Sequence, residues 1–195
     1  MITLTYTQTS AFRRFIEDEE LAVPVDLRVI AEAKPSEDEM KEADLWRWFR
    51  DELTSTYAGI DIQRVESGST SEGIPDVNYC LRGVEGWLEL KVGTITKRDP
   101  HLVTLGLRPA QAFWLARRAR AGGRASILAA IPPTEPLLTG RWGHLFLFSG
   151  LTAPRLREMD GSLGLDEIRR MAAADLPKQR GPQLAALFDQ LTKPL

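Results

Sequence analysis

The segment 125–131, ASILAAI, constrains the fold of this chain more than any other. An apolar run of this length, ended by Pro132 and Pro133, is typical of a β-strand that is covered on both faces. Such a strand needs helices on both sides of its sheet, so ASILAAI predicts a layered α/β architecture. The composition agrees, because 43% hydrophobic and 27% charged residues are ordinary values for a globular protein.

The segments around this run predict the order helix, three strands, helix, strand, strand and further helices. The first helix is expected from an N-cap at Ser36 to Tyr57. Its inward face is expected to carry Leu45, Trp48, Phe49, Glu52 and Leu53, with Trp46 off that face, at an interface. Strands are expected at 60–67, 74–81, 87–92, 125–131 and 144–150, and a second helix from Leu107 to Gly122. A mixed central sheet follows from this order.

We expect three parts in the 195-residue chain: an N-terminal extension (1–36), a core (37–150) and a C-terminal helical extension (151–195). The single cysteine, Cys80, excludes an internal disulfide and is typical of a reducing compartment, so a cytoplasmic protein is expected. The first twenty residues lack the pattern of a secretory signal. No apolar run approaches the length of a membrane span, so no membrane association is expected.

The charged residues are unevenly distributed along the chain. The net charge of −2 argues against a strongly basic nucleic-acid-binding protein. Residues 17–52, however, carry 13 acidic and 5 basic side chains, whereas residues 80–130 carry 9 basic and 3 acidic ones. This asymmetry indicates a polyanionic partner for the basic part, although solvated helix faces of opposite sign would give the same pattern.

Three charged residues, Asp76, Glu89 and Lys91, lie within or beside the strand-like runs of GIPDVNYCLRGVEGWLELKVG, residues 73–93. Burying a charge is unfavourable unless it is paired or bound to a metal. Because side chains alternate along a strand, a hairpin through RGVEG can bring these three together. Two adjacent carboxylates repel each other unless a cation lies between them, and their oxygens suit Mg²⁺ or Mn²⁺. The pattern therefore indicates metal-assisted attack on a phosphodiester, with a solvent-side ion pair of Glu89 and Lys91 as the alternative.

The motif GIPDV…WLELK, between two expected helices, resembles the PD-(D/E)xK nuclease superfamily. More narrowly it resembles the VRR-NUC nucleases and the Holliday junction resolvases of archaea and phages, over residues 38–132. The resemblance implies a restriction-endonuclease-like core of helix, three strands, helix and strand. It also implies that Asp76, Glu89 and the main-chain carbonyl of Leu90 ligate Mg²⁺ or Mn²⁺, and that Lys91 is the catalytic lysine.

The same resemblance implies further site residues. A glutamate of the first helix would complete the metal site, and Glu42, three residues before Leu45, fits best, with Glu39 and Glu52 as alternatives. Gln111 would orient water or contact the scissile strand, or else be an ordinary polar helix residue. The residues expected to contact phosphates are Ser67, Ser69, Thr70, Lys97, Arg98, Arg108, Arg117, Arg118 and Arg120.

The expected function is that of a metal-dependent DNA endonuclease acting on branched DNA such as Holliday junctions. Symmetric cutting of two strands needs two sites, so a homodimer is expected. Two alternatives stay open. One is a non-catalytic DNA-binding or assembly protein on the same fold, and the other is a restriction-type or repair nuclease that acts on linear, double-stranded DNA.

Overall fold

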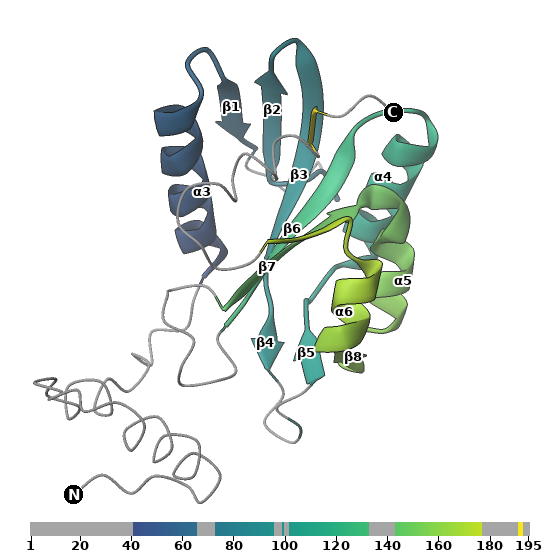
Figure 1. Cartoon of the computed structure of the whole chain (residues 1–195). Helices are drawn as coiled ribbons and strands as arrows, with labels where there is room; N and C mark the ends of the chain where they lie inside the picture. Colours follow the sequence, from purple (N-terminus) through teal and green to yellow (C-terminus); the bar gives the residue numbers. More distant parts are fainter. Residues whose placement is uncertain are drawn as a thin grey trace, which may run out of the picture. The chain divides into compact units, whose positions relative to one another are not determined.

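The computed structural model describes residues 41–65, 73–95, 99, 102–132, 143–176 and 191–192, all of which belong to the unit Met40–Leu195. Predictions for other residues, including the N-terminal extension, lie outside the described part. The elements in chain order (Figure 1) are α3 (Glu42–Thr56), β1 (Asp61–Arg64), β2 (Val77–Leu81), β3 (Val84–Val92), β4 (Thr94–Ile95), β5 (Leu102–Thr104), α4 (Pro109–Arg120), β6 (Ala125–Ile131), β7 (His144–Ser149), the 3-10 turn η1 (Gly150–Thr152), α5 (Ala153–Glu158), β8 (Leu163–Gly164), α6 (Leu165–Met171) and β9 (Ala174–Leu176).

A six-stranded mixed sheet with the order β1-β2-β3-β6-β7-β9 forms the centre of this unit. Strands β3 and β6 are parallel, whereas the other neighbouring strands are antiparallel. Helix α4 makes the crossover between the two parallel strands, as parallel pairing requires. The predicted α/β class with a mixed central sheet is therefore confirmed.

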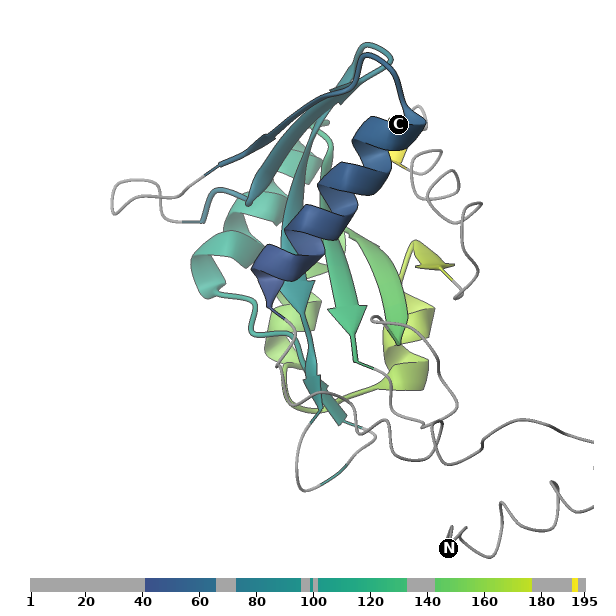
Figure 2. The same cartoon turned by 90° about the vertical axis from the view of Figure 1, so that its left-hand side faces the viewer.

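Helices cover both faces of the sheet, with α3 on one side and α4, α5 and α6 on the other (Figures 1 and 2). Strand β6 contributes to both cores. Leu128 and Ala130 belong to the cluster that contains the apolar residues of α3. Ile127 and Ala129 belong to the cluster that contains those of α4. The uninterrupted apolar pattern of ASILAAI thus reflects burial on both faces.

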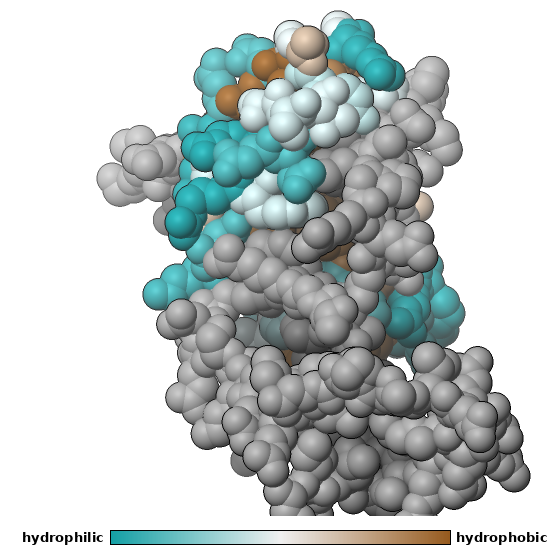
Figure 3. All heavy atoms as spheres, turned by 60° about the vertical axis from the view of Figure 1, so that its left-hand side comes forward, coloured by the Kyte–Doolittle hydropathy of each residue, from teal (hydrophilic) through white to brown (hydrophobic). Residues whose placement is uncertain are grey.

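Helix α3 differs from its prediction in two respects. Its predicted start with Ser36 as N-cap is wrong, because the backbone of Lys41 is extended (φ −111°, ψ 153°) and the helix begins at Glu42. The predicted interface position of Trp46 is also wrong, because Trp46 is buried in the core cluster of α3. Trp46, Phe49 and Leu53 share the i, i+3, i+7 spacing of one helix face. The outer surface around α3 is mostly hydrophilic (Figure 3).

Short strands account for the segments that the sequence does not predict. β4, β5 and β8 form a small three-stranded antiparallel sheet. The expectation of a helical region after residue 150 is only partly correct, since β9 pairs with β7. That pairing covers the otherwise open edge of β7. Among the described residues, no helix combines the length and the apolarity needed to cross a membrane.

Replacing Gly86 with alanine should lower the free energy of unfolding by about 1–3 kcal/mol. Gly86 pairs with Tyr79 across β2 and β3, and a Cβ at residue 86 would overlap the buried phenol of Tyr79. Urea denaturation of Gly86→Ala, alone and combined with Tyr79→Leu, measures this. Leucine at position 79 leaves room for the new Cβ, so Gly86→Ala should lower the free energy of unfolding much less in the Tyr79→Leu background. An equal loss in both backgrounds would contradict a close approach between Gly86 and Tyr79.

Candidate active site

The site begins where β2 and β3 separate. β2 starts at Val77, which pairs with Leu88, so the last four residues of β3 extend beyond β2. One step further in this register, Asp76 is opposite Glu89, and residues opposite each other share a face of the sheet. The Asp76 carboxylate turns towards β3 and its Oδ2 accepts the N–H of Leu90 at 2.9 Å. We call this opening between the two strands the fork.

The main chain of Leu90 is directed towards the fork. The amide of Trp87 donates to the carbonyl of Arg124 at 3.0 Å, and that of Gly93 donates to the carbonyl of Ala130 at 2.8 Å. These odd-numbered residues therefore bond to the β6 side. Because successive residues of a strand point their main-chain groups in opposite directions, the N–H and the C=O of Leu90 both face Asp76. A main-chain carbonyl is thus available beside the carboxylate.

Lys91 lies between two glutamates. Its Nζ is 2.8 Å from Oε1 of Glu42 and 2.9 Å from Oε1 of Glu89. The Lys91 side chain is 7% exposed and that of Glu89 is 0% exposed, whereas that of Glu42 is 43% exposed. The cluster is therefore reached from solvent on the side of Glu42, the first residue of α3.

The helix glutamate that reaches the cluster is Glu42. Glu52 lies ten residues further along α3, about 15 Å away along the helix axis, and cannot replace it. Glu39, the other alternative, lies outside the described residues. The position of Glu42 follows from the start of α3, because the first residue of the helix stands beside the end of β3.

Gln111 holds the buried glutamate from the opposite side. Its Nε2 donates to Oε1 of Glu89, and its Oε1 accepts the backbone N–H of Arg108 at 3.0 Å. Gln111 is buried and stands at the third position of α4, where a glutamine commonly accepts the N–H of the N-cap residue. In this structure Gln111 therefore positions Glu89, a role not expected from the sequence, although Gln at this position is a recognisable signal.

The two carboxylates of the fork are harder to ionise than usual. The pKa of Glu89 is raised to about 7; burial is the largest cause and the nearby Asp76 adds to the rise, while Lys91 opposes it. Burial also raises the pKa of Asp76, and the hydrogen bond from Leu90 opposes this. Burial by itself would lower the pKa of Lys91, but Glu89 and Glu42 outweigh it and the pKa is raised. Lys91 is therefore an ammonium at neutral pH.

The donors at the fork fit a hard divalent cation. Oε2 of Glu89 is buried and has no hydrogen-bond partner among the described residues, and such an atom calls for an ion or a water. Asp76 and the carbonyl of Leu90 face the same opening. Within the described residues, no three His, Cys, Asp or Glu side chains are arranged as a complete metal cage. Two carboxylates, one carbonyl and several waters are nevertheless a usual environment for Mg²⁺.

Replacing Glu89 with glutamine should make the protein more stable than the wild type at pH 8 in EDTA. The folded-state pKa of about 7 exceeds the ordinary 4.5, so ionisation of Glu89 destabilises the folded state as the pH rises through 7. The difference in unfolding free energy between Glu89→Gln and the wild type should grow from pH 4.5 to pH 8, by at most about 3 kcal/mol. Urea denaturation at several pH values measures it. Glu52→Gln is the control, and a pH-independent difference would contradict the prediction.

The predicted phosphate-contacting residues are only partly described. Ser67, Ser69, Thr70, Lys97 and Arg98 lie outside the described residues. Arg108 is exposed and caps the start of α4, next to Gln111. The last turn of α4 carries three exposed arginines, Arg117, Arg118 and Arg120. They lie about 9 Å or more from Gln111 along the helix axis. Of these four arginines, Arg108 is thus the nearest to the fork.

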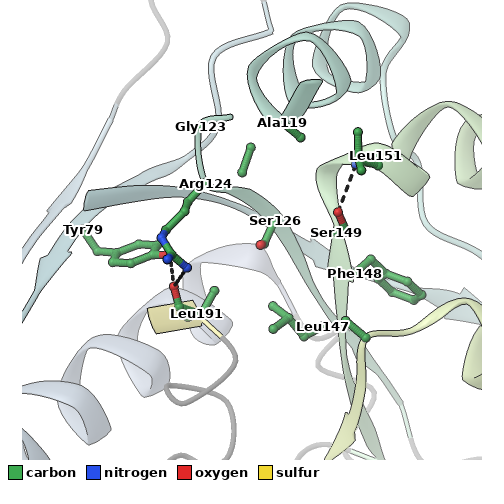
Figure 4. Close-up of a pocket in the computed structure, with 12 residues that line it drawn as sticks. Tyr79, Ala119, Gly123, Arg124, Ser126, Leu147, Phe148, Ser149, Leu151 and Leu191 are labelled. Atoms are coloured by element: carbon green, nitrogen blue, oxygen red, sulfur yellow. Dashed lines mark hydrogen bonds between the residues drawn. The ribbon is translucent and has the colours of Figure 1, made fainter. Parts of the chain in front are cut away.

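Figure 4 shows a cavity of about 170 Å³. Its lining residue Ala125 pairs with Trp87 of β3, so the cavity lies away from the fork, towards the start of β3. Tyr79 and Arg124 line it, and both donate to the main-chain carbonyl of Leu191, at 3.3 and 3.0 Å. No Asp, Glu or Lys of the described part of the chain is among its lining residues. The chemistry therefore favours the fork, and the contacts at the cavity attach Leu191 to the core.

Neither a protein-family model nor a curated protein matches this chain. The geometry of the fork and the chemistry of its side chains therefore carry the functional assignment. Those side chains come from four elements that meet at one end of β3: α3, the start of β2, β3 itself and the start of α4.

Proposed function

We propose that the protein is a metal-dependent endonuclease of the PD-(D/E)xK kind that hydrolyses DNA phosphodiester bonds, with branched DNA such as a Holliday junction as substrate. The observation that carries this proposal is the buried, unpartnered Oε2 of Glu89, within the described residues, beside Asp76 and Lys91. When only the strands of the six-stranded sheet are counted, the order α3, β1, β2, β3, α4, β6 supports a restriction-endonuclease-like core, with β4 and β5 of the smaller sheet inserted before α4. A homodimer would supply the two sites that a symmetric junction requires.

In this proposal Asp76, Glu89 and the carbonyl of Leu90 hold Mg²⁺ or Mn²⁺, with Glu42 completing the site directly or through water. The cation supplies Lewis acidity and neutralises the charge that develops on the phosphate. Gln111 keeps the Glu89 carboxylate in place through Oε1, and Oε2, which has no hydrogen-bond partner among the described residues, is left to bind the cation.

Lys91 positions the nucleophilic water for in-line attack. Because the pKa of Lys91 is raised, its side chain stays an ammonium at neutral pH. It therefore cannot act as a general base, and it acts as a hydrogen-bond donor and a positive charge. Glu42 lies on the solvent side of the ammonium, and its Oε1 is 2.8 Å from Nζ of Lys91. Lys91 is thereby oriented before the substrate binds.

A cleavage assay tests the proposal. End-labelled four-way junction, flap and linear duplex are incubated with the protein in Mg²⁺, Mn²⁺, Ca²⁺ or EDTA. We expect cleavage of the branched substrates in Mg²⁺ or Mn²⁺ and none in EDTA. Preferred cutting of the linear duplex would point to a restriction-type or repair nuclease. Binding of DNA without cleavage in any metal would favour the non-catalytic DNA-binding or assembly protein and would overturn the proposal.

A further inference from the structure

Helix α4 leads away from the candidate active site and carries an exposed aromatic side chain. Phe113 is 65% exposed, and among the described residues only Leu151, at 55%, is another large hydrophobic side chain with such exposure. The neighbouring Ala112 and Leu115 are buried, so Phe113 faces away from the sheet. A single exposed apolar side chain is common on protein surfaces, so its surroundings decide whether it has a role.

The surroundings of Phe113 are cationic. The guanidinium carbon of Arg117 lies 5.7 Å from the centroid of the Phe113 ring, within the range of a cation–π contact. Arg120 follows on the same helix face, at the i+7 position relative to Phe113. The chain has no acidic residue from position 100 to position 134, a stretch that includes all of α4. The outer face of α4 thus combines an aromatic ring with positive charges that no acidic residue of the helix offsets.

This face is close enough to the fork for one DNA strand to contact both. Gln111, which donates to Glu89, precedes Phe113 by two residues and lies on the opposite side of the helix. The Phe113 ring is therefore separated from the Glu89 carboxylate by one helix diameter and one hydrogen bond, roughly 13–15 Å in all. A strand with phosphates spaced about 3.4 Å apart along its axis crosses this distance within a few nucleotides.

We infer that Phe113 and Arg117 form a stacking site for an unpaired base a few nucleotides from the scissile phosphate, with Arg120 contacting the strand beyond it. An aromatic ring can stack on any base, because every base has a π-face, and guanidinium groups add cation–π and phosphate contacts. In a continuous duplex the base faces are already covered by their neighbours. The site therefore selects DNA with unpaired bases near the cut, such as a flap or an opened junction. This inference rests on the proposed function, since it names the substrate of the same site.

Charge favours DNA over a second copy of this chain as the occupant. A two-fold contact through this face would bring Arg117 and Arg120 of one copy against the same residues of the other, and like charges at an interface are unfavourable. A polyanion would instead be attracted by every arginine of the face.

Binding experiments without cleavage test the stacking site. The full chain carrying Asp76→Asn serves as the background, and fluorescence anisotropy in EDTA gives its affinity for a 5′ flap and for a blunt duplex of equal length. Adding Phe113→Ala should weaken flap binding about tenfold and change duplex binding less than twofold. Phe113→Trp should preserve flap binding. Leu151→Ala, the matched exposed hydrophobic residue, should change neither affinity.

An abasic nucleotide in the flap gives the decisive comparison. If one base stacks on Phe113, removing that base and removing the ring should not have additive effects. Arg117→Ala should weaken binding to both substrates and reduce the slope of log affinity against log salt by about one. A flap affinity that Phe113→Ala leaves unchanged, or additive effects at every abasic position, would overturn the stacking site.

The outcomes separate the two proposals. If the wild type never cuts DNA but its flap binding depends on Phe113, the nuclease proposal is overturned and the stacking site is retained. If the wild type cuts, and Phe113→Ala binds and cuts the flap equally well, only the stacking site is overturned. If Phe113→Ala changes the sedimentation coefficient of the free protein and leaves flap affinity unchanged, the face contacts a second copy and the stacking site is also overturned.

Discussion

Replacing Lys91 with methionine should lower the rate of DNA cleavage by at least about 10²- to 10³-fold, because the ammonium that positions the water is lost. Methionine is a long, unbranched side chain that can fill the space of the lysine stem. The substitution removes the charge that Glu89 and Glu42 share. Because Lys91 opposes the burial effect at Glu89, the pKa of Glu89 should rise further in Lys91→Met.

Single-turnover cleavage of a labelled junction at saturating protein measures this effect, and anisotropy in EDTA measures binding. We expect the binding affinity to change much less than the rate. Lys41→Met is the matched control, since Lys41 is an exposed lysine at the start of α3. A Lys91→Met protein that retains more than about a tenth of the wild-type rate would exclude a catalytic role for the lysine.

Replacing Asp76 with asparagine should abolish metal-dependent cleavage, with a loss of at least about 10³-fold, while leaving the fold intact. The asparagine oxygen can still accept the N–H of Leu90, so the hydrogen bond at the start of β2 is retained. The negative charge needed to hold a divalent cation is lost. Because burial raises the pKa of Asp76, removing its charge should not destabilise the protein by more than about 1 kcal/mol.

Mn²⁺ binding, followed by the loss of the free-ion electron paramagnetic resonance signal, gives a readout independent of cleavage. It should be weakened in Asp76→Asn and unchanged in Asp61→Asn, an exposed aspartate of β1. Urea denaturation should give similar unfolding free energies for both variants. If Asp76→Asn binds Mn²⁺ and cuts like the wild type, the role of Asp76 is only to hold Leu90, and the metal site is disproved.

Much of the architecture follows from local patterns. The continuous apolar run of β6 predicts burial on both faces, and the alternation in β3 predicts that Glu89 and Lys91 share a face. The turn between β2 and β3 predicts the antiparallel pair that brings Asp76 to the same face. These features depend on residues that are close in sequence, and backbone geometry relates such residues directly.

The contacts that complete the site join residues that are far apart in the sequence, so no local pattern specifies them. Glu42 meets Lys91 across 49 residues, and Gln111 meets Glu89 across 22 residues. Both contacts require α3 and α4 to start at the same end of β3. The exposure of Phe113 and the burial of Trp46 likewise depend on which helix faces pack against the sheet.

The sequence by itself determined the helices α3 and α4, the longer strands, the mixed sheet and the shared face of the charged residues, because these depend on the 2.0 and 3.6 periodicities of strand and helix. Only the tertiary structure decided that β2 starts opposite Leu88, so that the end of β3 opens into a fork. It also decided that one oxygen of Glu89 is held by Lys91 and Gln111 while the other is buried without a partner in the described residues. The physical reason is that strand register and helix position are set by how distant side chains pack together, which no local pattern specifies.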